Sequence, residues 1–539
     1  MELAKNQEHT VTIEGYGEGG MGVARIDGRV VFVHGALRGE KCRVLILKTL
    51  KSVAFAKVLE VIEPSSERIT PDCPYFPRCG GCTYRHIRYE EELRLKKQRV
   101  QDNLSRIGGS DVTVEEILGA RDTLRYRNKA QYPVSKDGAV GFYRARTHEV
   151  IECEHCLLVK PEADAAAEAL REYMQSCRVA GYDEKTGRGL VRHLYIRSNA
   201  AGESLACVLV NGDKLPKEDR LVTLLRDACP KCTGIVLGTN TKKGNVILGD
   251  RYRTLWGSDR LEDTLCGKTF RLSVPSFYQV NRVQAERLYA KAIEFAGLTG
   301  QETVLDLYCG AGTITLALSD HAKKVLGAEI VPEAIDDARE NAARNGVKNA
   351  EFFCGDASDV AKKLARENLR PDVITVDPPR KGLAADVVES IAEMQPQRVV
   401  YVSCDSATMA RDVKRFAALG YTARRACTVD LFPRADHVET VCLLVLRNPV
   451  THINIDVNVE EMVQDKRGLA TYGQIKDYVL KHSGLKVSSL YIAQVKQKCG
   501  IIERENYNKP KSEDAKQPQC PPEKEKAIRA ALQHFRLIE

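Results

Sequence analysis

The chain has 539 residues, of which 43% are apolar and 29% charged, a composition typical of a soluble globular protein with three or four domains. It holds no run of about 18 apolar residues, and its first ten residues include Glu2 and Glu8, so we expect neither a membrane span nor a secretory signal. Lysine and arginine number 81 against 73 aspartates and glutamates, and this net charge of +8 permits a polyanionic partner without requiring one. We therefore expect a cytoplasmic protein, with no membrane partner, that acts as a monomer.

Residues 1–62 are expected to form a small N-terminal β-barrel. Their apolar segments are short, are separated by glycine-rich turns, and lie at 11–13, 23–26, 29–33 and 41–48. Short strands divided by such turns are typical of a barrel or a sandwich.

Residues 63–282 are predicted to be a central α+β domain. It begins with a cluster of cysteines, which a charged helix over 90–107 follows. Helices are also expected over 163–175 and 215–227, between β-rich stretches.

Residues 283–450 differ in character, because strands and helices alternate there at a short and regular spacing. After a helix at 283–296, strands are expected at 303–307, 324–328, 350–354, 373–376 and 398–402. This alternation predicts a Rossmann-like, doubly wound parallel sheet. Residues 451–539 lose the pattern and are predicted to be a small helical C-terminal domain.

The segment VLDLYCGAGTITLAL (304–318) predicts a strand, a glycine-rich turn and a helix. Gly310 and Gly312 allow a sharp turn and a close approach to a ligand. A dinucleotide site would have glycine or alanine where Thr315 stands, which disfavours NAD. Glu329 and Asp356 follow the next two strands, where acidic residues can bind ribose hydroxyls or an adenine amino group. Together these features favour a nucleoside cofactor over a plain turn.

Three more residues with catalytic potential are expected at or near strand ends. Asp377 follows the strand at 373–376, where the alternative is a stiff proline turn. Cys404 follows another strand; such cysteines are mostly packing residues, but at a ligand-binding edge a cysteine can act as a nucleophile. Glu439 lies in an otherwise apolar strand, so it is either paired structurally or held for proton transfer.

The segments DLYCGAGT (306–313), DPPRKG (377–382), SCD (403–405) and HVET (437–440), in this order, resemble the S-adenosylmethionine (SAM)-dependent RNA uracil-C5 methyltransferases. VPSFYQVN (274–281) and YRNKAQ (126–131) resemble two further motifs of that family, and the similarity covers about 1–447. The resemblance implies methylation of C5 of a uridine.

The resemblance also implies the roles of the site residues. Cys404 would be the nucleophile that adds to uracil C6, and Glu439 the base that removes the C5 proton. Gln279, Tyr308, Glu329 and Asp377 would line the SAM site, although Asp377 could face the uracil instead. Asp356 is added to the SAM site from its strand-end position.

A cysteine cluster precedes these motifs, with the spacing Cys73-x5-Cys79-x2-Cys82. In a reducing compartment such thiols bind zinc or an iron–sulfur cluster, and spacing alone does not choose. Iron–sulfur members of the resembling family take a fourth cysteine from a segment like 141–159, which here offers Cys153 and Cys156. Cys156 is followed by leucine, as the fourth cysteine is in those members, and this context favours Cys156 over Cys153. The resemblance therefore implies a [4Fe–4S] cluster on Cys73, Cys79, Cys82 and Cys156.

The N-terminal unit resembles the TRAM domain, an RNA-binding barrel of the OB type, so RNA is the expected partner. A TRAM domain together with an iron–sulfur site is more similar to 23S ribosomal RNA enzymes than to transfer RNA enzymes. Two alternatives stay open: a tRNA uracil-C5 methyltransferase, and a non-catalytic iron–sulfur RNA-binding protein that keeps the fold as a scaffold. An amino-methylating enzyme is disfavoured, because Arg380 stands where those enzymes place an aromatic residue.

The C-terminal residues 451–539 are predicted to contain two helices across a short turn at Ser483-Gly484, a unit similar to a helix-turn-helix. This stretch has 15 basic and 12 acidic residues, a net charge of +3. Two interpretations are nearly equal: phosphate contacts to a folded RNA, or a helical cap on the catalytic domain.

Overall fold

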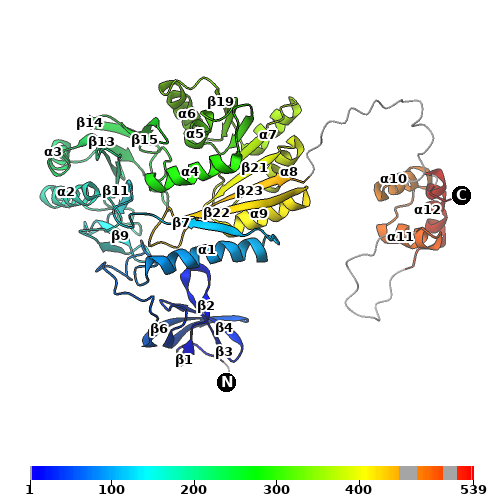
Figure 1. Ribbon diagram of the computed structural model, residues 1–539, viewed down its shortest axis with the longest axis horizontal. Coiled ribbons are helices and arrows are strands. Elements are labelled where there is room, and N and C mark those ends of the chain that lie inside the picture. Colours follow the sequence, from blue (N-terminus) through cyan, green and yellow to red (C-terminus); the bar gives the residue numbers. More distant parts are fainter. Residues whose placement is uncertain (1–2, 448–469, 502–518, 536, 539) are drawn as a thin grey trace. The chain divides into compact units, whose positions relative to one another are not determined.

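The computed structural model describes residues 3–447, 470–501, 519–535 and 537–538. The chain divides into two compact units, residues 1–449 and residues 450–539 (Figure 1). No helix within these described ranges is long and apolar enough to cross a membrane.

The N-terminal residues form one six-stranded sheet, which confirms the expected β domain. In spatial order its strands are β1 (Glu8–Thr12), β5 (Lys41–Thr49), β6 (Val53–Glu63), β4 (Arg29–His34), β3 (Gly22–Ile26) and β2 (Gly15–Tyr16). Alternate residues such as Val31 and Val33 point into a common core. The sequence analysis missed β6, the longest strand, because its inward residues Ala54 and Ala56 are too small to give a strong apolar alternation.

The central part is built on a five-stranded sheet. In spatial order its strands are β14 (Arg251–Gly257), β13 (Cys232–Thr239), β12 (Ser204–Val210), β11 (Val191–Ser198) and β8 (Lys129–Pro133). Helices α2 (Pro161–Cys177) and α3 (Glu218–Ala228) pack against it through one apolar cluster. Two hairpins accompany the sheet: β9 (Gly141–Tyr143) with β10 (Val150–Glu152), and β15 (Arg260–Leu265) with β16 (Lys268–Ser273).

An eight-stranded sheet follows and confirms the predicted doubly wound architecture. Its order is β19 (Ala350–Cys354), β18 (Lys324–Glu329), β17 (Thr303–Leu307), β20 (Val373–Val376), β21 (Arg398–Ser403), β23 (Glu439–Leu446), β22 (Tyr421–Val429) and β7 (Val114–Leu118). The first five strands are parallel, and β23 runs antiparallel to β21. The carboxyl ends of β17 to β21 therefore meet the beginning of β23 at one edge.

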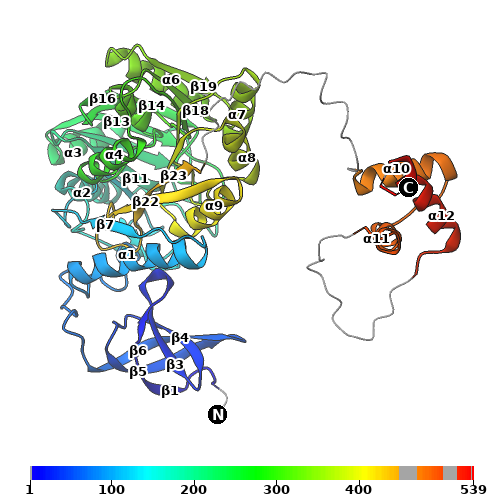
Figure 2. The same ribbon diagram turned by 45° about the vertical axis from the view of Figure 1, so that its right-hand side comes forward.

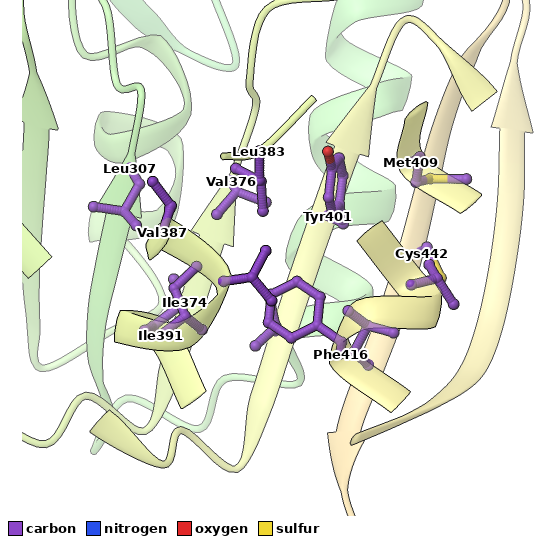
Figure 3. Close-up of a cluster of buried hydrophobic side chains, with 14 of the residues drawn as sticks. Leu307, Ile374, Val376, Leu383, Val387, Ile391, Tyr401, Met409, Phe416 and Cys442 are labelled. Carbon is purple, nitrogen blue, oxygen red and sulfur yellow. The ribbon is translucent and has the colours of Figure 1, made fainter. Parts of the chain in front are cut away.

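Helices cover both faces of this sheet, because successive strand residues point to opposite sides. Val304 packs towards α4 (Arg282–Ala296), α5 (Thr313–Ser319) and α6 (Pro332–Arg344). Leu305 packs on the other face, with α7 (Ala357–Arg366), α8 (Ala385–Met394) and α9 (Ser406–Ala418) (Figure 2). Figure 3 shows the centre of this second layer, where Phe416 of α9 lies beside side chains of α8 and β20.

Strand β7 was not anticipated as part of this sheet. It lies between residues 63 and 282, which the sequence analysis assigned to the central domain, yet it pairs in parallel with β22, Leu118 opposite Val429. The helix before it, α1 (Tyr89–Arg106), buries Val100 and Leu104 in the same core as α9. The segment from α1 to β7 is thus structurally part of the doubly wound sheet.

The described residues of the C-terminal unit form three helices, α10 (Tyr472–Ser483), α11 (Ser489–Lys498) and α12 (Pro522–His534), which confirms the expected helical character. Thr471 and Gln474 form a capping box at the start of α10. Gly484 ends that helix in the left-handed conformation, and the Ser488 hydroxyl accepts from Tyr491 N at the start of α11. The three helices bury a core of Ile475, Val479, Ile492, Val495, Ile528, Ala531 and Leu532.

Candidate active site

The register of the eight-stranded sheet brings the expected site residues together. Leu307 of β17 pairs with Ala328 of β18 and with Val376 of β20. Each of these strand residues is followed by one expected site residue. Tyr308, Glu329 and Asp377 therefore stand side by side at the carboxyl edge of the sheet.

The glycine-rich turn after β17 is held by Glu329. Gly310 has a φ of 53° and Gly312 a φ of 83°. These left-handed conformations are strained for any residue with a β-carbon, so glycine is favoured at both positions. Gly310 N donates to Glu329 Oε2 over 3.3 Å, and Val331 N donates to Glu329 Oε1 over 3.0 Å. Tyr308 also has a positive φ, 70°, so the turn begins directly after the strand.

Asp306 is a site residue that sequence analysis did not single out. It is buried, and its two carboxyl oxygens accept from Thr315 Oγ1 at 2.5 Å and from Thr375 Oγ1 at 2.8 Å. Burial raises the pKa of Asp306 to about 6. Thr315, which departs from a dinucleotide turn, thus ties the first turn of α5 to the strand below.

Asp356 has a structural role that the sequence analysis did not consider. Its Oδ1 accepts from Ser358 N at 2.9 Å and caps α7, while the residue is exposed. Its assignment to the cofactor site stays a prediction.

Gln279 lies in the VPSFYQVN segment, which is hydrogen-bonded to the YRNKAQ segment. Asn128 Nδ2 donates to Gln279 O over 2.9 Å, and Asn128 N donates to Val280 O over 2.8 Å. Asn281 then caps α4 and also donates to Leu431 O at 3.1 Å. These contacts join YRNKAQ and VPSFYQVN and attach them to the loop between β22 and β23.

Cys404 and Glu439 are neighbours across the antiparallel pair β21 and β23. Ser403 pairs with Thr440, so Cys404 emerges next to the first residue of β23. Glu439 is only 4% exposed, whereas Cys404 is half-buried.

The electrostatics of this group are dominated by burial. Burial, with the charge of Asp377, raises the pKa of Glu439 to about 8. Burial, with Asp306, raises the pKa of Asp377 to about 7. Burial and the carboxylates of Glu439 and Asp377 raise the pKa of the Cys404 thiol to about 11. The two carboxyl groups, Asp377 and Glu439, therefore titrate near neutral pH, whereas burial and their charges favour the neutral thiol of Cys404.

Arg380 opposes this effect. Its guanidinium lowers the pKa values of both Cys404 and Glu439, though by less than burial raises them. Its Nη2 lies 3.0 Å from His437 Nε2, and its carbonyl accepts from Thr408 Oγ1 at 3.1 Å. From the sequence, Arg380 served only to argue against the amino-methylating enzymes. Its position directly after DPP and before HVET was the sequence signal that it belongs to this site.

The loop that leads into Glu439 is fixed by α1. Lys96 Nζ donates to Glu92 Oε1 and Asp430 Oδ1, each at 2.7 Å, and all three side chains are fully buried. Arg434 N donates to Glu92 Oε1 at 2.7 Å, and Thr83 N donates to Arg434 O at 2.7 Å. The residues just after Cys82 and the residues just before Glu439 are thus bound to each other.

The predicted cysteine cluster comes together in space. Cys73, Cys79, Cys82 and Cys156 all line one cavity of about 210 Å³, and Cys153 lines it too. Arg85, Arg127 and Lys129 add positive charge to its wall. Among the residues that the structure describes, no group of three or more histidine, cysteine, aspartate or glutamate side chains is arranged to hold a metal ion. The [4Fe–4S] site therefore stays a prediction.

The other close pair, Cys229 and Cys232, is buried at 5% and 8% exposure. Cys229 Sγ donates to Glu162 O at 3.3 Å, and Cys232 Sγ donates to Gly234 O at 3.3 Å. These contacts agree with a packing role.

The doubly wound sheet, the glycine turn and the acidic strand ends together define a SAM-dependent methyltransferase. The family model for tRNA (uracil-5-)-methyltransferase matches residues 88–447, and the TRAM domain model matches residues 3–59. The chain belongs to this RNA uracil-5-methyltransferase family and carries an N-terminal TRAM domain.

Relatives and a solved structure agree with this assignment. An RNA methyltransferase of Clostridium acetobutylicum, itself uncharacterised, is 41% identical over 449 residues, which are 82% of this chain and 98% of that protein. A relative of the same description from Halalkalibacterium halodurans is 42% identical over 449 residues. The tRNA (uracil-54, C5)-methyltransferase of Pyrococcus abyssi, solved with S-adenosyl-L-homocysteine, is 26% identical at a TM-score of 0.66, covering 81% of this chain and all of that one.

Proposed function

We propose that this enzyme methylates C5 of a uridine in 23S ribosomal RNA, with Cys404 as nucleophile and Glu439 as base. The observation that carries the mechanism is the register of β21 and β23, which sets a half-buried thiol beside a buried carboxyl group at the carboxyl edge of the sheet. Asp377 and Arg380 flank the pair through their charges.

The chemistry requires these two groups in sequence. Uracil C5 is a weak nucleophile, and the Cys404 thiolate, by adding to C6, places negative charge on C5 and O4. SAM supplies a methyl group on a positively charged sulfur. Glu439 then removes the proton from C5, the C6–S bond breaks, and Cys404 is released as a thiolate.

The pKa values of the site suit these roles. Glu439, with its pKa raised to about 8, can take up and release a proton near neutral pH. Arg380 favours the thiolate form of Cys404, because its positive charge lowers the pKa of that thiol. The pKa of Asp377 is raised to about 7, and its charge raises the pKa values of both Cys404 and Glu439, which supports a role for Asp377 at the uracil over one at the cofactor.

The SAM site would lie over the glycine turn, between Tyr308 and Glu329 and next to the Gln279 segment. Glu329 is already oriented by Gly310 N and Val331 N, so its carboxylate is placed to accept from ribose hydroxyls. Asp356 is exposed at the end of the next strand, and we assign it to the adenine ring of SAM.

We assign the cysteine cavity to an iron–sulfur cluster, because cysteine thiols gather there beside a cationic wall. Five thiols line the cavity, although no three described ligands are arranged to hold a metal ion. A cubane is wider than an ion, and the cationic wall formed by Arg85, Arg127 and Lys129 would offset the charge of four thiolates. Cys73, Cys79, Cys82 and Cys156 would hold it, and Cys153 is the competing ligand.

Transfer RNA is the second candidate substrate, supported by the solved Pyrococcus abyssi relative, which is described as a tRNA enzyme. The experiment that separates the two maps 5-methyluridine in ribosomal and transfer RNA from a strain that lacks the gene. Loss of a 23S site with intact tRNA would support the proposal. Loss confined to tRNA would replace the substrate, and loss of neither would favour a non-catalytic RNA-binding protein.

A further inference from the structure

The C-terminal unit is an addition to the methyltransferase. The family model ends at residue 447, and the Clostridium acetobutylicum relative is matched over 98% of its own length by 82% of this chain. Almost the whole of that relative is therefore matched without a counterpart of this unit. The described helices α10, α11 and α12 also have a core of their own, so they pack as a separate unit.

The segment that holds its first two described helices is more positively charged than the segment that holds α12. Residues 470–501 contain five lysines and a single acidic residue, Asp477, for a net charge of +4. Residues 519–535 contain three basic and two acidic residues, for a net charge of +1. The imbalance thus lies on α10, α11 and the turn between them.

The lysines of residues 470–501, which we call the first half of the unit, differ in how far a partner neutralises their charge. Lys498 Nζ lies 2.6 Å from Glu525 Oε2 of α12, so its charge is paired. Lys481 and Lys486 are exposed and form no ion pair with any residue that the structure describes. Lys476 donates to Ser489 Oγ at 2.8 Å, a neutral partner that leaves its charge uncompensated. These three lysines belong to α10 and the turn, and we call them the α10 lysine set.

Exposed polar groups lie next to this set. Ser488 and Ser489 are exposed at the beginning of α11, which contains no acidic residue. Helix N-termini and hydroxyl groups bind phosphate oxygens, and unpaired lysines supply the attraction at longer range. A surface of unpaired lysines, serine hydroxyls and a helix start fits the backbone of a nucleic acid.

We propose that the C-terminal unit is an accessory RNA-binding module, whose α10 lysine set contacts phosphates of the substrate RNA outside the methylation site. The choice of RNA rests on the RNA methyltransferase family, and the inference does not depend on which RNA is methylated. The module would raise affinity and the rate of encounter without changing the chemical step.

The test compares two double variants of the full-length chain. Lys481→Gln with Lys486→Gln removes two unpaired charges of the set, and Lys524→Gln with Lys526→Gln removes the same charge from α12. The probe is a transcript of a large-subunit ribosomal RNA domain, with binding measured at increasing salt. The first variant should lower the slope of log K against log salt by about 1.5, as two lost phosphate contacts require. The α12 variant should lower it much less.

Two further readouts keep the test decisive. Both variants should keep the melting temperature, SAM binding and the methylation rate at saturating RNA, because the changed lysines are exposed and lie outside the segment that the family model matches. Asp477→Asn should strengthen RNA binding, since it removes the one acidic residue of this half. An unchanged slope in the α10 variant would overturn the proposal and favour a protein partner. Equal losses in both double variants would show diffuse attraction in place of a defined surface. If methylation is absent while the slope changes as expected, only the proposed catalytic function fails.

Discussion

Lys96 Nζ lies 2.7 Å from Asp430 Oδ1, an ion pair between residues that are 334 positions apart in the chain. Lys96 also contacts Glu92 Oε1 and Phe432 O, and Tyr89 donates to the other oxygen of Asp430 at 2.7 Å. This buried pair fastens α1 to the loop that enters β23, whose first residue is Glu439.

Lys96→Met should destabilise the enzyme by about 3–5 kcal/mol, because it leaves the buried carboxylate of Asp430 without its cation and leaves Glu92 with only Arg434, at 3.5 Å. Urea unfolding measures the loss. Lys97→Met is the matched control, since Lys97 is the next residue of the same helix and bonds only the carbonyl of Glu115 at an exposed site. A loss of equal size in both variants would contradict the role of the buried pair.

Cys404→Ala should abolish methylation while SAM binding persists, because addition to C6 precedes methyl transfer. RNA that carries 5-fluorouridine should form a stable covalent adduct with the unmodified enzyme and none with this variant, since fluorine cannot leave as a proton. Denaturing gels detect the adduct. Cys354→Ala, which removes an exposed thiol at the end of β19, should behave as the parent enzyme does. Appreciable turnover by Cys404→Ala would refute the covalent mechanism.

Glu439→Gln should permit addition and methyl transfer but block removal of the C5 proton, so an RNA–protein adduct should accumulate with normal substrate RNA. A variant that is inactive and forms no adduct would give Glu439 a different role.

The same variant has a predictable effect on stability. The pKa of Glu439 is raised from 4.5 to about 8 in the folded chain. The folded state therefore holds a proton that the unfolded state releases, and this contribution to stability is present below about pH 4.5 and is lost as pH rises through about 8. Glu439→Gln should raise the melting temperature relative to the parent above pH 8 and change it least in acid. An equal shift at every pH would show that the carboxyl group does not titrate in this way.

Arg380→Met should slow formation of the 5-fluorouridine adduct and shift its pH dependence upward, because the pKa of the Cys404 thiol loses the influence that lowers it. Part of the rate should return at higher pH. The groups that still act on the thiol are Glu439, Asp377 and Asp405, and all three raise its pKa. Lys381→Met, at the neighbouring exposed position, should leave the profile in place. A uniform loss at every pH would point to RNA positioning by Arg380.

Protein purified without oxygen should contain about four irons per chain if the cubane is present. Cys156→Ser should lose the iron, and Cys153→Ser should keep it, although both thiols line the cavity. Metal analysis and the visible spectrum of each variant measure this. Zinc in place of iron would refute the cluster, and loss of iron only in Cys153→Ser would exchange the fourth ligand.

The sequence by itself determined the parts that depend on local pattern. Strands β17 and β20 fall where the alternation of apolar segments predicted them, because a buried parallel strand leaves a continuous apolar run between turns. Strand β19 also falls where it was predicted, although it lies at the edge of the sheet and is partly exposed. In a doubly wound sheet the carboxyl ends share one edge, so the motifs after these strands indicated one common site before any distance was known.

Only the tertiary structure decided the contacts between distant segments. Strand β7 is short and half polar, and it joins the sheet solely because β22, about 310 residues later, offers a free edge. The Thr375–Asp306 bond, the Arg380–His437 contact and the Lys96–Asp430 pair likewise have no local signature. Strand register and helix packing decide which side chains meet across the fold. The sequence pattern constrains these contacts only between residues that are close together in the chain.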